Sequence, residues 1–206
     1  MTRILMVRHG HVEGIEPPRF RGRRELPLTA LGQRQAAATA ARIAAGVEVA
    51  AVWTSPLQRC VETGRAIAEA TGAKARVVEA LNDLDYGDWT WLTHEAARAA
   101  DRDLYDRWYS APASVRFPGG ESLQDLVLRA GDALRLAAAE GVGEGRVLVL
   151  VTHDSVGRAV LMQALDQPLS AYRRLVMSPC SITEIDAPGG HVQVLGVNAT
   201  EHLEAV

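Results

Sequence analysis

The clearest hydrophobic pattern in the chain consists of three short runs of almost continuous apolar residues, at positions 4–7, 49–53 and 147–151. Short runs of this kind, rich in β-branched side chains, are typical of strands that are buried on both faces of a parallel sheet. A shorter run at positions 76–81 is consistent with one further strand. The sequence therefore predicts a sheet whose central strands are covered on both sides.

Between these runs the polar and apolar positions follow the period of an α-helix. Residues 29–44 carry an alanine-rich apolar stripe of this kind. Ser55 and Pro56 are predicted to begin the next helix, with Ser55 as its N-cap and Pro56 at its first helical position. The helices predicted from these patterns occupy residues 29–44, 57–70, 121–139 and 154–165.

The last part of the chain has a different pattern. Two runs at 181–185 and 191–197 flank Pro188-Gly189-Gly190 and predict two strands joined by a hairpin turn. Strands that alternate with helices are typical of a mostly parallel sheet with helices on both faces. We therefore predict an α/β fold, a three-layer α/β/α sandwich with a mostly parallel sheet and one antiparallel edge strand, formed by a single domain over residues 1–206.

Composition excludes several classes of protein. The formal net charge of the 206 residues is −3, which argues against a nucleic-acid or membrane-surface partner because such proteins usually carry a basic surplus. No apolar stretch is long enough to span a membrane, and the N-terminal residues lack the pattern of a signal peptide. Cys60 and Cys180 are too few and too far apart to predict a disulfide framework. We therefore expect a cytoplasmic protein.

Polar side chains with useful chemistry follow the predicted strands. Ligands bind open parallel sheets at the carboxyl ends of the strands, so the residues at these ends are expected to converge. They are Arg8 and His9 after the first strand, Thr54, Ser55 and Arg59 after the second, Asp83 after the run at 76–81, and Thr152 and His153 after the third. The sequence thus brings two histidines, two arginines and one carboxylate to one edge of the sheet.

This set of residues favours phosphoryl transfer. The guanidinium groups of Arg8 and Arg59 match phosphate oxygens in pairs, and His9 is a competent covalent nucleophile once one ring nitrogen is held as a donor. Asp83 could protonate the departing alkoxide if its surroundings raise its pKa. His153 would add positive charge near the phosphoryl oxygens. Such a site needs no metal and no cofactor, because the basic side chains neutralise the phosphoryl group themselves.

Other interpretations remain open. Each of these residues, taken singly, is more often a structural or solvated side chain, and only their joint placement favours function. His9, His11, His153 and Asp154 are also potential zinc ligands, although a divalent cation would be repelled by the neighbouring arginines. The Gly119-Gly120 pair lacks the lysine of a Walker-type phosphate loop.

Several motifs in this order resemble the histidine phosphatase superfamily, which includes the cofactor-dependent phosphoglycerate mutases. The motifs cover nearly the whole chain. They are Val7-Arg8-His9-Gly10, the arginine-rich loop Arg19-Phe20-Arg21-Gly22-Arg23, the helix start Leu26-Pro27-Leu28-Thr29, Ser55-Pro56-Leu57-Gln58-Arg59, Leu81-Asn82-Asp83 and Val151-Thr152-His153. The resemblance implies a phosphoglycerate mutase-like fold, with His9 as the phosphorylated residue. It also implies that Arg8, Arg21, Arg59 and His153 bind the phosphoryl group, and that Asp83 is the proton donor.

The sequence departs from the family pattern at three places. Asp83 stands where the family usually has glutamate, so the donor is one methylene shorter. Trp89-Thr90-Trp91 replaces Trp-Glu-Gly, and His11 replaces the glutamate or glutamine that follows Arg-His-Gly in most members. We expect His11 and Glu13 either to contact the substrate or to be solvated loop residues.

The segment 84–117 is expected to cap the pocket, with its aromatic residues forming either a packing cluster, a dimer contact or a specificity wall. Mutases of this family carry paired arginines there, whereas Arg98 and Arg102 are four residues apart, as on a solvated helix face. This favours a phosphomonoesterase acting on a small phosphorylated metabolite. A phosphoglycerate-type mutase and a non-catalytic module that binds a phospholigand are the alternatives, and a homodimer is conceivable.

Overall fold

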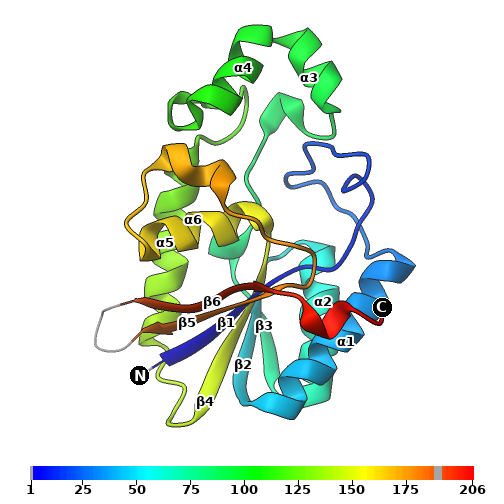
Figure 1. Cartoon of the computed structure of the whole chain (residues 1–206), viewed down its shortest axis with the longest axis vertical. Helices are drawn as coiled ribbons and strands as arrows, with labels where there is room; N and C mark the ends of the chain where they lie inside the picture. Colours follow the sequence, from blue (N-terminus) through cyan, green and yellow to red (C-terminus); the bar gives the residue numbers. More distant parts are fainter. Residues whose placement is uncertain (1, 188–191) are drawn as a thin grey trace.

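The structure, a computed structural model, describes residues 2–187 and 192–206. At its centre lies a six-stranded sheet with the order β3-β2-β4-β1-β5-β6 (Figure 1). The strands are β1 (Thr2–Arg8), β2 (Glu48–Thr54), β3 (Lys74–Val77), β4 (Arg146–Thr152), β5 (Ile182–Ala187) and β6 (Gln193–Ala199). Strands β1 to β4 pair in parallel, β5 is antiparallel to β1, and β6 is antiparallel to β5. The predicted α/β class with a mostly parallel sheet is therefore confirmed.

Helices cover both faces of the sheet, as predicted. Figure 1 shows α1 and α2 together on one side and α5 and α6 on the other. The α-helices are α1 (Ala30–Gly46), α2 (Gln58–Thr71), α3 (His94–Ala100), α4 (Arg102–Ser110), α5 (Leu123–Ala139) and α6 (Asp154–Ala164). Short 3₁₀ helices are η1 (Glu79–Leu81), η2 (Gly87–Trp89), η3 (Pro112–Ser114), η4 (Leu169–Arg174) and η6 (Glu201–Leu203). Among the described residues, no helix is long and apolar enough to cross a membrane.

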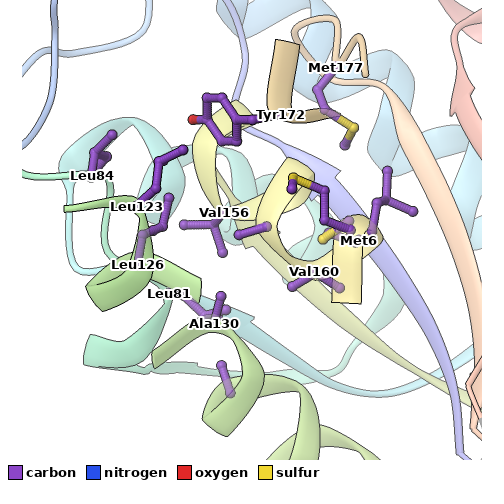
Figure 2. Close-up of a cluster of buried hydrophobic side chains, with 14 of the residues drawn as sticks. Met6, Leu81, Leu84, Leu123, Leu126, Ala130, Val156, Val160, Tyr172 and Met177 are labelled. Carbon is purple, nitrogen blue, oxygen red and sulfur yellow. The ribbon is translucent and has the colours of Figure 1, made fainter. Parts of the chain in front are cut away.

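The middle residues of β1 and β4 are apolar because alternate side chains enter two different cores. Leu5 and Val7 of β1 pack in one cluster with Ile43 of α1 and Ile67 of α2. Met6 belongs to the larger cluster on the opposite face, together with residues of α5 and α6. Figure 2 shows this second cluster, in which Val156 and Val160 lie between Met6 on one side and Leu126 and Ala130 on the other. Burial on both faces of the sheet holds the central strands, and so the residues at their carboxyl ends, in a fixed position.

Three local predictions differ from the structure. Residues 74–77 form β3, whereas residues 79–81 turn into η1, because Leu81 N and Asn82 N donate to the carbonyls of Val78 and Glu79. Ser55 is not the N-cap of α2, which begins after Leu57 without a side-chain cap. The antiparallel strand β5 lies one position inside the sheet, since its hairpin partner β6 occupies the edge. The predicted turn at 188–190 lies outside the described residues.

The segment 84–117 forms a helical cap, which Figure 1 shows as α3 and α4 at one end of the molecule. Its larger aromatic residues pack on one another. Phe117 lies edge-on to Tyr86, Trp89 and Trp108, with ring centroids 4.9–5.4 Å apart. Trp89, Trp108 and Phe117 are all at most 3 % exposed. These aromatic residues therefore form a packing cluster that holds the cap in place.

Candidate active site

The two histidines meet where β1 and β4 end side by side. Arg8 and Thr152 are paired at the carboxyl ends of these strands, and His9 N donates to the carbonyl of Thr152 at 2.9 Å. The rings of His9 and His153 are both fully buried, with centroids 5.2 Å apart. The convergence that the strand ends predict is therefore present in the fold.

His9 is held as a neutral imidazole with one nitrogen turned inward. Its Nδ1 lies 2.7 Å from the carbonyl oxygen of Gly10, which can only accept, so the ring proton is on Nδ1. Gly10 N in turn donates to Thr63 Oγ1 on α2. Burial, reinforced by the positive charge of Arg59, holds the pKa of His9 well below its ordinary value. His9 Nε2 therefore carries an unprotonated lone pair at neutral pH.

Arg59 connects the nucleophile with the candidate acid. It lies in the first turn of α2 and is fully buried. Its Nε donates to His9 Nε2 at 3.2 Å, and its Nη2 donates to Asp83 Oδ2 at 2.9 Å. The carbonyls of Gly22 and Arg24 accept from its Nη2 at 2.7 Å and its Nη1 at 2.8 Å. The arginine-rich loop thus fixes the guanidinium through its backbone.

Asp83 lies in the loop after η1 and is 4 % exposed. Its Oδ1 accepts from Ser155 Oγ at 2.5 Å and from Leu84 N at 2.8 Å. Its Oδ2 lies 3.5 Å from His153 Nδ1, in addition to the bond from Arg59. The carboxyl group therefore faces both the second histidine and the arginine beside His9.

Two residues that hold Asp83 were not predicted from the sequence. Ser155 is in the first turn of α6 and binds the carboxylate directly. Arg129 of α5 donates to the carbonyls of Asn82 and Asp83 at 2.5 and 2.8 Å, and its Nε donates to Glu121 at 2.9 Å. Neither has a sequence signal of its own except that Ser155 follows His153 by two positions.

His153 is a neutral donor rather than a cation. Its Nε2 lies 2.8 Å from Ser55 Oγ, and burial together with Arg59 lowers its pKa well below the ordinary value. If Ser55 donates to Nε2, the ring proton is on Nδ1, on the side of Asp83. Cys60 Sγ is 3.4 Å from the same Nε2. Burial raises the pKa of Cys60, so its thiol stays protonated and is a weak nucleophile.

Arg8 and Arg21 belong to the same site, and some of their N–H groups have no hydrogen-bond partner among the described residues. Arg8 Nη1 donates to the carbonyl of Met177 and Arg21 Nη1 to that of Gly14. The Nε of each is buried and has no hydrogen-bond partner among the described residues. Asp154 lies 4.0 Å from Arg21. Burial alone would raise the pKa of Asp154, but Arg8 and other arginines lower it overall, so it is ionised.

A cavity of about 180 Å³ opens beside Asp83. Its walls come from the arginine-rich loop, the cap, α6 and η4. Its lining residues are Pro18, Arg19, Phe20, Arg21, Gly22, Asp83, Tyr86, His94, Trp108, Asp154, Arg158, Tyr172 and Arg173. Asp83 therefore lies between the buried cluster around His9, to which Arg59 joins it, and this arginine-rich cavity.

The motifs and this geometry agree with a comparison against known families, in which the histidine phosphatase superfamily (branch 1) matches residues 4–200. The chain belongs to the histidine phosphatase superfamily. Its sequence is 31 % identical over 212 residues to the probable phosphoglycerate mutase GpmB of Enterobacter sp. (strain 638), covering all of this chain and 96 % of that protein. The chain spans about half the length (55 %) of the curated mycobacterial relatives that it matches at 36 % identity.

Two solved structures are similar to nearly the whole chain. Bacillus stearothermophilus YhfR has a TM-score of 0.92 at 28 % identity, with 99 % of this chain and 100 % of that chain covered. The native mycobacterial glucosyl-3-phosphoglycerate phosphatase Rv2419c has a TM-score of 0.85 at 27 % identity, with 97 % and 99 % covered. The phosphoglycerate mutase-like fold that the resemblance implies is therefore confirmed.

Of the site residues proposed from the sequence, Arg21 and Asp83 line the cavity. Arg8, His9, Arg59 and His153 lie behind Asp83 in the buried cluster, whereas His11 and Glu13 belong to neither group. His11 Nδ1 lies 2.9 Å from Thr29 Oγ1, and its backbone N donates to Gln35 Oε1, so His11 joins its loop to the start of α1. Glu13 is exposed. Among the described residues, no group of three or more histidine, cysteine or acidic side chains has an arrangement that could hold a metal ion.

Proposed function

We propose that this histidine phosphatase is a phosphomonoesterase that acts through a phosphohistidine on His9. The observation that carries the proposal is the arrangement of His9, in which Nδ1 is fixed by Gly10 O and Nε2 lies beside the guanidinium of Arg59. A neutral imidazole whose one lone pair, on Nε2, accepts only from a phosphate-binding group such as Arg59 Nε becomes an activated nucleophile when phosphate takes that donor. Binding alone would require neither this nucleophile nor a carboxyl group opposite it.

In the first step, a phosphomonoester binds with its phosphoryl oxygens on Arg8, Arg21, Arg59 and His153. Arg59 Nε then donates to a phosphoryl oxygen and releases the lone pair of His9 Nε2. The new N–P bond forms as the P–O bond to the alcohol breaks. Because the phosphoryl group also engages Arg59 Nη2, Asp83 Oδ2 becomes free to hold a proton and deliver it to the leaving alkoxide.

In the second step, water attacks the phosphohistidine. Asp83 takes a proton from this water as the O–P bond forms, and the N–P bond breaks to return the electron pair to Nε2. Inorganic phosphate leaves and the enzyme is restored. The electrostatic contribution comes from preorganised donors that are buried and need little rearrangement, so the residues here require no cofactor for either step.

The similarity to the probable phosphoglycerate mutase GpmB favours the mutase alternative. A mutase must hold a second acidic group from the cap, yet Arg98 and Arg102 are exposed and both lie 3.6 Å from Asp106 on α4. They do not line the cavity. Hydrolysis is therefore the reaction that we propose, with a small-molecule phosphomonoester as the substrate.

The test is to trap the intermediate. The protein is mixed with p-nitrophenyl phosphate, quenched in alkali, which preserves phosphohistidine, and analysed by mass spectrometry of the peptide that contains His9. We expect one phosphoryl group on this peptide and release of inorganic phosphate. His9→Ala should lose both, while the control His202→Gln, outside the site, should retain both. Normal phosphate release by His9→Ala would refute the proposal, and transfer to an acceptor without phosphate release would favour the mutase.

A further inference from the structure

The wall of the cavity opposite the arginine-rich loop carries two arginines that the proposed reaction does not use. Arg158 comes from α6 and Arg173 from η4. Arg158 Nε and Arg173 Nη2 are buried and have no hydrogen-bond partner among the described residues. Buried donors without a partner are rare in folded proteins. Two of them on this wall, in addition to Arg21 Nε in the same cavity lining, point to a missing acceptor.

Both guanidinium groups are held by aromatic rings. Arg158 lies over Tyr172 at 5.3 Å, and Arg173 lies over Tyr109 at 3.8 Å and over Trp108 at 4.7 Å. Arg173 Nε also donates to the carbonyl of Trp108 at 3.4 Å. Stacking of this kind fixes a guanidinium while leaving other N–H groups free. The two arginines are therefore positioned before any ligand arrives.

The charges around the cavity are unbalanced. Its lining includes four arginines and two carboxylates. Asp83 is paired with Arg59, and Asp154 lies 3.5 Å from Arg158 and 4.0 Å from Arg21. Arg173 has no carboxylate within ion-pair distance in the part of the chain that the structure describes. Burial, assisted by Arg173 and Arg21, lowers the pKa of His94 on the same wall. The cavity therefore favours an anion.

The position of the cavity indicates which part of a substrate would occupy it. Asp83 belongs both to the phosphoryl site, through Arg59, and to the lining of the cavity. In the proposed reaction the oxygen that leaves phosphorus receives its proton from Asp83. The alcohol portion of the substrate must then extend from Asp83 into the cavity, toward Arg158 and Arg173.

We propose that the alcohol portion of the substrate carries a second anionic group, a carboxylate or a second phosphate, that binds Arg158 and Arg173. This inference rests on the proposed phosphomonoesterase activity and narrows its substrate class. The second anion is held by α6 and η4 rather than by the cap arginines Arg98 and Arg102, which are directed at Asp106. A phosphomonoester of a neutral alcohol would leave the two buried donors unpaired.

A pair of substrates of equal length tests the proposal. 3-Phosphoglycerate and glycerol 3-phosphate differ only in a terminal carboxylate against a hydroxymethyl group, and glycerol 1,3-bisphosphate supplies a second phosphate instead. Hydrogen bonds to charged groups typically contribute enough to change kcat/KM about tenfold or more. For 3-phosphoglycerate, glycerol 1,3-bisphosphate or both, we expect the wild type to have a kcat/KM about tenfold higher than for glycerol 3-phosphate. Which of the two is preferred distinguishes the carboxylate from the phosphate.

Variants show whether the arginines cause the preference. The preference is the ratio of kcat/KM for the better of the two substrates with a second anion to kcat/KM for glycerol 3-phosphate. Arg173→Gln should bring this ratio close to one. Arg173→Lys should retain part of the preference because a point charge remains. Arg174→Gln is the matched control, since Arg174 is the adjacent residue, is exposed and does not line the cavity. It should keep the wild-type ratio. Thermal melting of each variant verifies that the fold is retained.

The outcomes separate this inference from the proposed function. If the wild type forms the phosphohistidine on His9 but hydrolyses all three substrates with equal kcat/KM, the inference is wrong and the phosphatase proposal stands. The inference is likewise wrong if Arg173→Gln and Arg174→Gln show the same preference for the substrates that carry a second anion. If no substrate is turned over, calorimetric binding of 3-phosphoglycerate and glycerol 3-phosphate decides. Tighter binding of 3-phosphoglycerate that only Arg173→Gln abolishes supports the subsite, and equal binding refutes it.

Discussion

Acidification should destabilise this protein through its two buried active-site histidines. His9 and His153 are fully buried, and burial together with the nearby charge of Arg59 lowers the pKa of both well below 6.5. Below pH 6.5 the unfolded chain therefore binds protons at these positions that the folded chain does not bind. The free energy of unfolding then falls as the pH falls, and this contribution to stability is fully present only above the unfolded pKa.

The size of the effect follows from the linkage relation. Each histidine that stays neutral in the folded state contributes a limiting slope of about 1.4 kcal/mol per pH unit. Integrated from pH 7 to pH 5 with an unfolded pKa of 6.5, this is about 2 kcal/mol for each histidine, or about 4 kcal/mol for both. A typical domain has a free energy of unfolding of only about 5–15 kcal/mol, so the change should be easy to measure.

The assay is urea denaturation at pH 7, 6 and 5, followed by tryptophan fluorescence, for the wild type and for the double variant His9→Asn/His153→Gln. His9→Asn keeps a side-chain donor for Gly10 O, and His153→Gln keeps a polar group near Ser55 Oγ. The double variant should lose about 4 kcal/mol less than the wild type over this interval, with an unchanged m-value. An equal loss in both proteins would show that the two histidines are already protonated in the folded state, and the assignment of neutral His9 would fail.

Two further predictions concern the proton donor Asp83 and the close packing of Gly32 against the loop after His9. Asp83→Asn should lower kcat/KM for alkyl phosphates by about 10²–10⁴, but much less for p-nitrophenyl phosphate, whose leaving group needs no proton. Equal slowing of both substrates in steady-state assays would contradict the acid role. Gly32→Ala would place a Cβ 2.2 Å from the carbonyl oxygen of His11, so the loop after His9 must shift. Urea denaturation should show a loss of about 1–3 kcal/mol, whereas Gly196→Ala, whose Cβ has open space, should be much milder. Equal losses would refute the steric argument.

The sequence predicts the centre of the site well because each key residue directly follows a strand or begins a helix after one. His9 and His153 lie at the ends of neighbouring parallel strands, and the strands are recognisable from their apolar runs alone. Arg59 lies one helical turn further on, so its direction follows from the period of α2. Strand order and helix period together are enough to bring these three side chains near one another.

The remaining site residues depend on packing between distant elements. Arg129 reaches the loop of Asp83 from the middle of α5, and Arg173 enters the cavity from η4. Nothing in the local pattern around either residue indicates what it touches. The apolar run at 76–81 also predicts a later end for this strand than β3 has, because η1 turns the chain before Asp83. Hydrogen bonds across 46 positions of sequence, such as that between Arg129 and Asp83, are set by tertiary structure alone.

The position of β4 in the sheet has a consequence for how the protein is made. Strand β4 lies between β1 and β2, although residues 146–152 are synthesised about 90 residues after the end of β2. Until that part of the chain leaves the ribosome, β1 and β2 have no common neighbour and their inner edges stay unpaired. Exposed strand edges of this kind are prone to wrong pairing. A nascent chain should therefore depend on chaperones until β4 enters the gap, and a chain truncated before residue 146 should accumulate as aggregate rather than as a half-formed enzyme.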